Sequence, residues 1–386
     1  MKLVNFSIKN VKSFRESTSV SFDDKLNILI GPNGGGKSNF LDIITVSFRR
    51  FLLLTYEVSE DRDKPGLTIR KPFSRNPIDK LLEKYIGDNT ESQIEIKIKV
   101  DKQDIDNIRT LKKYSKEFKR VLEVKYSIKD YSSENQKIIE LIDRLNDLPE
   151  TISLDPEVNF LITNNKLAEP EFYRFERDYL IYLNSLELCL ILAKDISDIE
   201  LNPIYLYFSP YRSENNFTTQ INLAANNYYE LLAEYLEASS KKTASIIKLA
   251  SLHFAEKKRI YEYKSSKVQG DTTLWNNDEE VKKVTEILEK LGFSWDLPLI
   301  NTNKNIYEII LSKQNQEFSL AQASSGEKEI INFILGLFAL NIKGGLLIID
   351  EPELHLHPKW QSLFLDVLID LAEMTNQSIY FVNALY

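Results

Sequence analysis

Cysteine, histidine and long apolar runs are scarce in this chain of 386 residues. The single cysteine, Cys189, excludes an internal disulfide and is typical of a reducing compartment. Three histidines and one cysteine are too few for a structural zinc site. The longest apolar stretches, near residues 188–193 and 333–340, are too short to span a bilayer. The N-terminal residues do not resemble a signal peptide. We therefore expect a cytoplasmic protein with no membrane partner.

Positive charge is also in short supply, because 57 acidic residues outweigh 49 basic ones. This balance disfavours a protein that coats nucleic acid without selectivity. Local basic clusters nevertheless occur at Lys112, Lys113, Lys116, Lys119 and Arg120, and at Lys257, Lys258 and Arg259. Acidic residues interleave with both clusters, so we interpret them as solvated helix faces, with DNA contact as the alternative.

The pattern of apolar residues predicts an α/β protein. Strands are expected over residues 3–10, 18–22 and 94–100, with residues 121–128 as a partner strand of the last. A charged helix near residues 104–118 precedes a mostly helical region over residues 133–195. Further strands are expected at 204–208, 294–297, 306–312, 345–349 and 378–382, and helices within 221–263 and at 279–291, 327–340 and 359–375. No sustained heptad run indicates a long coiled coil.

One segment fits the phosphate-binding pattern G-x-x-x-x-G-K-[ST]. Its residues are Gly31, Pro32, Asn33, Gly34, Gly35, Gly36, Lys37 and Ser38, followed by Asn39. A short buried strand is expected before it, at residues 26–30, and an apolar-periodic helix after it. The glycines would let backbone N–H groups surround phosphate oxygens, Lys37 would supply positive charge, and Ser38 would hold Mg²⁺. The sequence therefore predicts a site for a nucleoside triphosphate.

A second apolar run, at residues 346–349, ends in the two carboxylates Asp350 and Glu351. Such a run is typical of a strand that is buried on both faces of a parallel sheet. At the carboxyl end of that strand, Asp350 would contact the Mg²⁺ of a bound nucleotide. Glu351 would then accept a proton from the attacking water, so we predict it as the catalytic base. Lys37, which supplies positive charge to the β- and γ-phosphates, is the second predicted catalytic residue.

Three motifs resemble those of a known group of ATPases. The segment Ser324, Ser325, Gly326, Glu327 and Lys328 is similar to the signature motif of ABC-type ATPases, in the form found in SMC-, RecF- and OLD-type proteins (OLD, overcoming lysogenization defect). Residues 8–14 resemble the I-x-N-F-[KR]-x-F opening of the same group, and residues 350–358 resemble the D-E-P-E-x-x-L-H-P stretch of OLD-like ATPases. The middle of the chain resembles the group only weakly.

The resemblance implies an ABC-type P-loop head, with a mixed sheet flanked by helices, an antiparallel β subdomain and a mostly helical insertion. Residues 1–56 and 201–386 would form the head, and residues 57–200 the insertion, with strands near 94–128 belonging to the head and a helical part at 133–195. Heads of this type form a homodimer around two ATP molecules. The signature residues Ser324, Ser325, Gly326 and Glu327 would contact the γ-phosphate bound by the partner.

Other positions follow from the same resemblance. Arg212 follows a predicted strand where the group has its glutamine-loop equivalent, and it would reach the phosphates; a surface position is the alternative. Lys12 and Arg15 would likewise approach the nucleotide. The alternate spacing of His355 and His357 suits a dimer-contact loop better than a metal site. OLD-like ATPases have a histidine that senses the γ-phosphate where this chain has Ala384. We expect either slow hydrolysis or a chain that is truncated or variant at this end.

The favoured hypothesis is an ATP-hydrolysing head of OLD-like or Septu-like type that needs ATP and Mg²⁺. It would control a partner effector, such as a nuclease, in a prokaryotic anti-phage complex. One alternative is a DNA-repair ATPase related to RecF and SMC proteins that binds DNA when ATP is present. Another is an ATP sensor that assembles an effector without hydrolysis.

Overall fold

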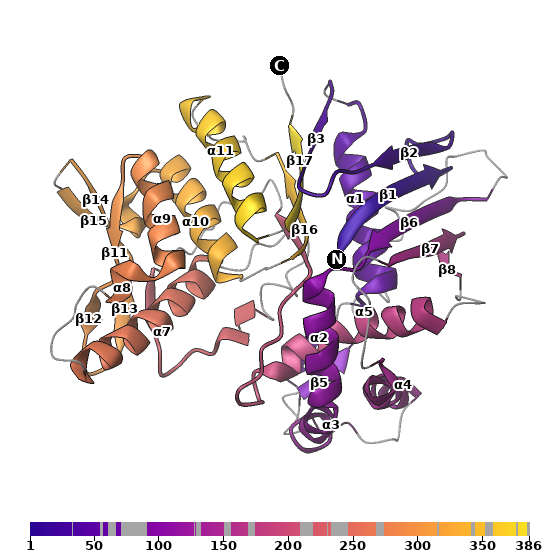
Figure 1. The fold of residues 1–386 in the computed structure, drawn as a ribbon, viewed down its shortest axis with the longest axis horizontal. Coiled ribbons are helices and arrows are strands. Elements are labelled where there is room, and N and C mark those ends of the chain that lie inside the picture. The colour runs from indigo at the N-terminus through magenta and orange to yellow at the C-terminus, as the bar shows by residue number, and fades with distance from the viewer. Residues whose placement is uncertain are drawn as a thin grey trace. The chain divides into compact units, whose positions relative to one another are not determined.

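The computed structural model describes residues 1–32, 34–54, 57–60, 67–70, 91–126, 128, 133–149, 156–168, 174–208, 219–229, 231–232, 246–267, 274–314, 316–340, 344–351, 358–375 and 377–383. These residues form a mixed α/β fold with several sheets, which confirms the predicted fold class (Figure 1). The chain divides into two compact units. The first contains Met1–Phe208, Lys343–Glu351 and Ala372–Tyr386, and the second contains Ser209–Ile342 and Pro352–Leu371.

A parallel sheet of four strands lies in the first unit. Its order is β3 (Leu26–Ile30), β17 (Gln377–Asn383), β16 (Gly345–Asp350) and β9 (Tyr205–Phe208). Every residue of β16 is buried, as its continuous apolar run predicts. The strand predicted at residues 26–30 is confirmed as β3, but its predicted burial is wrong, because β3 lies at the edge of this sheet. Its Ile28 and Ile30 side chains are 43% and 60% exposed.

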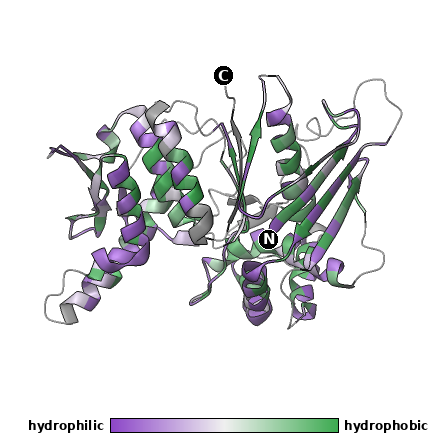
Figure 2. Cartoon of the chain, turned by 45° about the horizontal axis from the view of Figure 1, so that its top comes forward, coloured by the Kyte–Doolittle hydropathy of each residue, from purple (hydrophilic) through white to green (hydrophobic). Residues whose placement is uncertain are grey.

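An antiparallel sheet completes the β structure of the first unit's core. Its order is β2 (Thr18–Ser21), β1 (Lys2–Lys9), β6 (Gln93–Lys99), β7 (Glu157–Thr163) and β8 (Lys166–Leu167). Apolar and polar residues alternate along these strands, as the stripes in Figure 2 show. Phe6 and Ile96 are cross-strand partners, Ile96 also pairs with Phe160, and all three are buried. This sheet therefore turns one apolar face inward. A separate hairpin consists of β4 (Glu57–Glu60) and β5 (Leu67–Arg70).

Helices in the first unit depart from prediction in two places. They are α1 (Lys37–Ser47) with its π-helical continuation (Phe48–Leu52), α2 (Lys102–Lys113), α3 (Ser115–Val124), α4 (Ser133–Asp143), a 3₁₀ turn (Arg144–Asp147) and α5 (Arg174–Ala193). The strand predicted at residues 121–128 is wrong, since residues 121–124 belong to α3. Phe118 and Leu122, four residues apart, are fully buried on one face of that helix, whereas Val124 is 74% exposed. The region 133–195 contains α4, the 3₁₀ turn and α5, as its predicted helical character requires, but β7 and β8 between α4 and α5 were not predicted.

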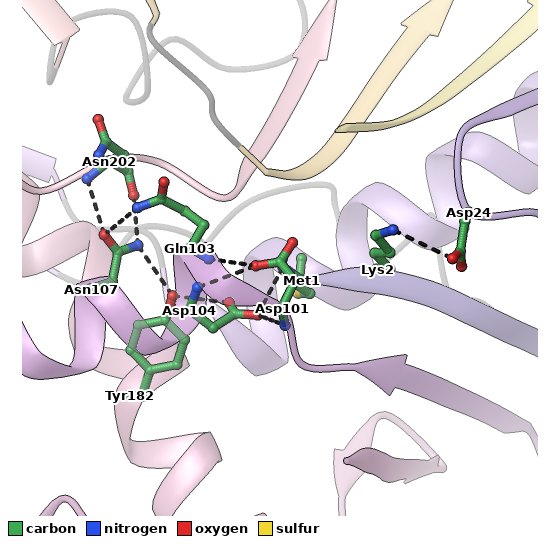
Figure 3. A network of polar contacts seen from close by, with 9 residues as sticks. All are labelled: Met1, Lys2, Asp24, Asp101, Gln103, Asp104, Asn107, Tyr182 and Asn202. Atoms are coloured by element: carbon green, nitrogen blue, oxygen red, sulfur yellow. Dashed lines mark hydrogen bonds and ion pairs between the residues drawn. The ribbon is translucent and has the colours of Figure 1, made fainter. Parts of the chain in front are cut away.

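A buried polar network joins β1, α2 and α5 (Figure 3). The Met1 ammonium lies 2.8 Å from Asp104 Oδ2 and 2.5 Å from Asp101 Oδ2. Asp101 also caps α2 by accepting the backbone N–H of Asp104 at 3.2 Å, and the Tyr182 hydroxyl donates to Asp104 Oδ1 at 3.1 Å. Burial raises the pKa of Asp104, although the ammonium acts in the opposite direction. The network fixes the start of the chain against the helices behind the sheet.

The second unit combines helices with two small antiparallel sheets. Its helices are α7 (Ile246–Lys267), α8 (Leu274–Asn277), α9 (Glu279–Lys290), a 3₁₀ turn (Leu320–Gln322), α10 (Ser325–Ala339) and most of α11 (Pro358–Thr375). One sheet has the order β10 (Gln220–Asn222), β13 (Ile306–Glu308), β12 (Leu299–Asn301). The other has the order β11 (Ser294–Asp296), β14 (Ile310–Lys313), β15 (Gln316–Ser319). The helices predicted at 279–291, 327–340 and 359–375 are confirmed within two residues at their ends. Among the described helices, none is both long and apolar enough to cross a bilayer.

Candidate nucleotide-binding site

The glycine-rich loop joins β3 to α1, the context that its sequence pattern requires. Gly34 and Gly36 have φ angles of 79° and 86°, in the left-handed region that favours glycine. The Gly35 N–H donates to the Pro32 carbonyl at 3.0 Å, and a Cβ on Gly35 would lie 3.0 Å from that same oxygen. Gly34 and Gly36 thus supply φ angles that would strain other residues, and the missing side chain of Gly35 allows its close approach to Pro32.

The start of α1 provides donors suited to an anion. Its N-cap residue, Gly36, has no side chain to cap the helix, and its first turn contains no acidic residue. The Lys37 ammonium bends back and donates to the carbonyls of Gly31 at 2.6 Å and Pro32 at 3.0 Å. Ser38, in the first turn, is exposed. Free N–H groups, a helix dipole and an ammonium at one place fit a phosphate group.

A turn near the N-terminus supports the loop from the side. Val11 and Phe14 exchange two backbone hydrogen bonds, at 3.0 and 2.9 Å. The Ser13 hydroxyl accepts a hydrogen bond from Asn39 Nδ2 at 3.3 Å, and a Cβ on Gly36 would meet Ser13 Oγ at 3.4 Å. The loop motif and the N-terminal motif are thus in direct contact.

Lys12 lies in the same turn, with a φ of 49°. Its ammonium donates to Asn39 Oδ1 at 3.3 Å and lies 3.4 Å from Asp42 Oδ2 on α1. Lys12, which we predict to contact the nucleotide, therefore lies beside the first turns of α1. Its contact with a nucleotide stays a prediction. Arg15 is exposed.

Asp350 is the last residue of β16, at the carboxyl ends of the parallel strands, where the phosphate loop also begins. Asp350 pairs with Val382 of β17, and Ile30, the last residue of β3, pairs with Asn383. Two strand spacings separate β3 from β16, or about 10 Å. Helix α1 also packs against β16. The carboxylate therefore ends at the level at which the phosphate loop begins.

The Asp350 side chain is held by a residue that the motifs do not include. Asp350 is 5% exposed, and its Oδ2 accepts a hydrogen bond from the Tyr207 hydroxyl of β9 at 3.3 Å. Burial, reinforced by the charge of Asp350, raises the pKa of Tyr207 far above its usual value. The phenol therefore stays protonated and remains a donor.

Glu351 follows with a left-handed φ of 46° and is half-buried. Non-glycine residues held in this region cost about 1–3 kcal/mol and concentrate at functional sites. The backbone thus turns sharply at the residue that we predict as the catalytic base.

The signature segment begins α10 in the second unit. Ser324 is the N-cap residue, and its hydroxyl donates to Glu327 Oε2 at 2.8 Å and accepts the Glu327 N–H at 3.4 Å. Lys313 of β14 donates to the other Glu327 oxygen at 2.8 Å. Burial alone would raise the pKa of Glu327, but the bonds from Lys313 and Ser324 lower it. Ser325 and Gly326 lie in the first turn of α10, so this helix starts two residues before its predicted beginning.

Comparison with known proteins gives a match that covers nearly the whole chain. The family described as the AAA ATPase domain matches residues 1–380. The chain belongs to this family. The prediction of an ATPase is confirmed at the level of the domain.

The curated relatives match this ATPase domain only over short segments. It is 46% identical over 44 residues to the chromosome partition protein Smc of Halobacteriovorax marinus, which is 11% of this chain and 4% of Smc. It is 36% identical over 74 residues to the DNA replication and repair protein RecF of Lactobacillus johnsonii, which is 19% of this chain and 18% of RecF. The matched segments thus span a small part of either relative.

Among solved structures, the ATPase domain resembles an SmcHead bound to the C-winged helix domain of ScpA. The TM-score is 0.47 and the identity 13%, over 100% of this chain and 90% of the other. It also resembles the SMC head domain from Thermotoga maritima, with a TM-score of 0.38 and 15% identity, over 99% of this chain and 89% of that head.

The predicted site residues of the ATPase domain divide into three groups. The first unit contains the phosphate loop and, in addition, Lys12, Asn39, Asp350 and Glu351. The second unit contains the four signature residues. Asn33, Arg212, His355, His357 and Ala384 lie outside the described residues. Over the described ranges, no group of three or more His, Cys, Asp or Glu side chains is arranged to hold a metal ion.

Sequence reasoning missed Tyr207 and Asp42. Tyr207 lies within a strand that was predicted for its apolar character, so its hydroxyl gave no separate signal. Its role depends on the pairing of Tyr207 with Ile348, two residues before Asp350. Asp42 lies four residues after Ser38, so both residues are on one face of α1. This spacing could have identified Asp42 as a carboxylate near the site, where it contacts Lys12.

Proposed function

We propose that the chain binds ATP on its phosphate loop and hydrolyses it as an ABC-type head. The observation that carries the proposal is that Lys37, the start of α1 without a side-chain cap, and Asp350 all lie at the carboxyl ends of the strands of one parallel sheet. Backbone N–H groups of Gly34 and of residues 36–38 would bind phosphate oxygens, and Lys37 would exchange its two carbonyl partners for the β- and γ-phosphates.

Ser38 and Asp350 are the residues that would hold Mg²⁺. Bound there, the ion would neutralise charge that develops on the phosphates. Tyr207 keeps one oxygen of Asp350 in place through its hydrogen bond. Glu351 would accept a proton from the attacking water, a role supported by its position directly after the buried strand and its turned backbone.

The proposal includes a homodimer formed through the ATP sites. The N–H groups of Ser325 and Gly326, in the first turn of the 15-residue helix α10, are donors of the kind that bind a γ-phosphate, and the Ser324 hydroxyl would exchange its Glu327 partner to join them. In our proposal, these donors meet the nucleotide of a second copy, and Lys12 and Arg212 add positive charge near the site. ATP would favour the closed pair because only the closed pair makes these contacts.

The closed and open forms would control a partner effector, such as a nuclease, in an anti-phage complex. This part of the proposal rests on the similarity of residues 350–358 to OLD-like ATPases. With Ala384 at the expected histidine position, turnover would be slow, and the limiting case is an ATP sensor without hydrolysis.

A second candidate is a DNA-repair or chromosome-maintenance ATPase, which the similarity to segments of Smc and RecF favours. The basic clusters give it less support. Lys119 lies 2.7 Å from Asp143, Lys257 contacts Asp278 and Glu280, and Lys258 lies 2.6 Å from Asp296. DNA affinity that requires ATP and falls with salt would favour this candidate over the first.

The nucleotide site is tested by Lys37→Ala. We expect this variant to lose ATP binding in equilibrium dialysis, because the loop then lacks the ammonium that lies against its Gly31 and Pro32 carbonyls. Lys116→Ala, which removes an exposed lysine of α3, is the matched control and should bind ATP normally. Equal ATP affinity in the two variants would refute the site.

The dimer and the catalytic base are tested together by Glu351→Gln. Loss of a general base slows a reaction roughly 10²- to 10⁴-fold, so bound ATP should persist. We expect size-exclusion chromatography with light scattering to show a dimer with ATP and a monomer without it. A variant that hydrolyses ATP at the rate of the unmodified chain would exclude this role for Glu351.

A further inference from the structure

The second unit contains a cavity of about 940 Å³ that shares no residue with the nucleotide site. It lies among α7, α8, α9 and β11, which appear in orange in Figure 1. Its size falls within the usual range for ligand sites. Nothing in the proposed ATPase chemistry uses it.

Three aromatic side chains form the apolar part of its wall. The ring centres of Trp275 and Tyr261 are 6.4 Å apart, and those of Trp275 and Trp295 are 6.0 Å apart. Trp295 is fixed by a hydrogen bond from its Nε1 to Thr285 Oγ1 at 2.9 Å and by an edge contact with Phe254 at 5.3 Å. All three remain half-buried rather than buried. Partly exposed, rigid aromatic rings are typical of surfaces that bind partners.

Charged side chains form the remainder of the lining, and the acidic ones predominate. The carboxylates are Glu262, Glu286 and Asp296, and the cations are Lys258 and Lys282. Lys258 is already bound to Asp296 at 2.6 Å, and its ammonium lies 5.6 Å from the ring centre of Trp275. The wall thus already places Lys258 over Trp275, and Lys264 lies 5.4 Å from the ring centre of Tyr261. Glu262 and Glu286 lie at the exposed rim, where Glu262 accepts a hydrogen bond from the Tyr307 hydroxyl at 2.9 Å and Glu286 lies 3.3 Å from Lys283.

We propose that this cavity binds a basic peptide segment of a partner protein, with arginine or lysine side chains placed against the aromatic rings. Cations are attracted to the faces of Trp and Tyr, and the rim carboxylates complement their charge. A single-stranded nucleic acid would also stack on aromatic rings, but it needs a positively charged groove, and this lining has one more carboxylate than ammonium groups. The site is independent of ATP binding.

The test uses the full chain with Trp360→Phe, so that tryptophan fluorescence reports Trp275 and Trp295 alone. The probe is the peptide acetyl-Gly-Arg-Gly-Arg-Gly-amide. The matched probe replaces each arginine by citrulline, which has the same shape without the charge. We expect saturable quenching by the arginine peptide, weakened by added salt, and roughly tenfold weaker binding of the citrulline peptide.

Variants locate the binding without disturbing the aromatic rings. Glu262→Gln with Glu286→Gln should weaken the arginine peptide roughly fivefold, since exposed ion pairs contribute modestly. Glu123→Gln, which removes an exposed carboxylate of α3 in the first unit, should leave it unchanged. Equal affinity for the two peptides, tighter binding of oligothymidylate, or no saturable quenching would each overturn the proposal.

Discussion

Gly345 offers the sharpest test of the parallel sheet that carries the site. It begins β16 with a φ of 121°, and a Cβ there would lie 2.4 Å from the Ile204 carbonyl oxygen and 2.8 Å from its carbon. These are backbone atoms, which cannot rotate away. Moving them beyond 3.0 Å would strain the adjacent hydrogen bond from the Leu346 N–H to the same oxygen, now 2.8 Å long.

Gly345→Ala therefore combines two costs. An L-residue with positive φ costs about 1–2 kcal/mol, and forcing an atom into a packed site costs about 1–3 kcal/mol. We expect the free energy of unfolding to fall by about 2–5 kcal/mol. Gly292→Ala is the control, because Gly292 has a φ of 85° but a Cβ there meets nothing within 4 Å. In that variant, the free energy of unfolding should fall only by the cost of a positive φ, about 1–2 kcal/mol.

Urea unfolding followed by far-UV circular dichroism measures both variants. Hydrogen exchange of peptides from β9 and β16 adds a local readout, which matters because a chain with two units can unfold in more than one step. If Gly345→Ala is no more destabilising than Gly292→Ala and exchange in β9 and β16 is unchanged, the close approach of these strands is refuted.

Two further predictions concern charged groups. Burial alone would raise the pKa of Asp278 and of Glu280, but hydrogen bonds and positive charge, with Lys257 contacting both, lower them. Carboxyl groups whose pKa is lowered by folding stabilise the fold above their unfolded pKa, which is about 4. This stability is lost as the pH falls from there through the lower folded pKa values. Lys257→Met should therefore flatten the decline in thermal stability over that range, and a decline as steep as in the unmodified chain would contradict the assignment. Tyr207→Phe removes a hydrogen bond to the buried Asp350 and should lower the free energy of unfolding by about 1–3 kcal/mol in urea; an unchanged value would show that the bond contributes nothing.

The sequence by itself determined the elements whose signals are local. The glycine pattern at residues 31–38 predicted the strand-loop-helix context, because glycine adopts positive φ angles such as those of Gly34 and Gly36 without the strain that a side chain adds. The continuous apolar run before Asp350 predicted a strand buried on both faces, and all of β16 is buried. Ser324 followed by Glu327 forms a capping box at the start of α10, a local motif that the signature resemblance had already located.

Tertiary structure alone decided the pairings between distant segments. Residues 121–124 combine strand-like composition with helical spacing, and burial of Phe118 and Leu122 on one face made them helical. The link between Tyr207 and Asp350 joins positions 143 residues apart, so it exists only through the parallel register of β9 and β16. Likewise, Trp275 and Trp295 form a cavity wall because α8 and β11 both pack against neighbouring helices. Local periodicity encodes which face of an element is apolar, whereas its partner is chosen by packing across the whole chain.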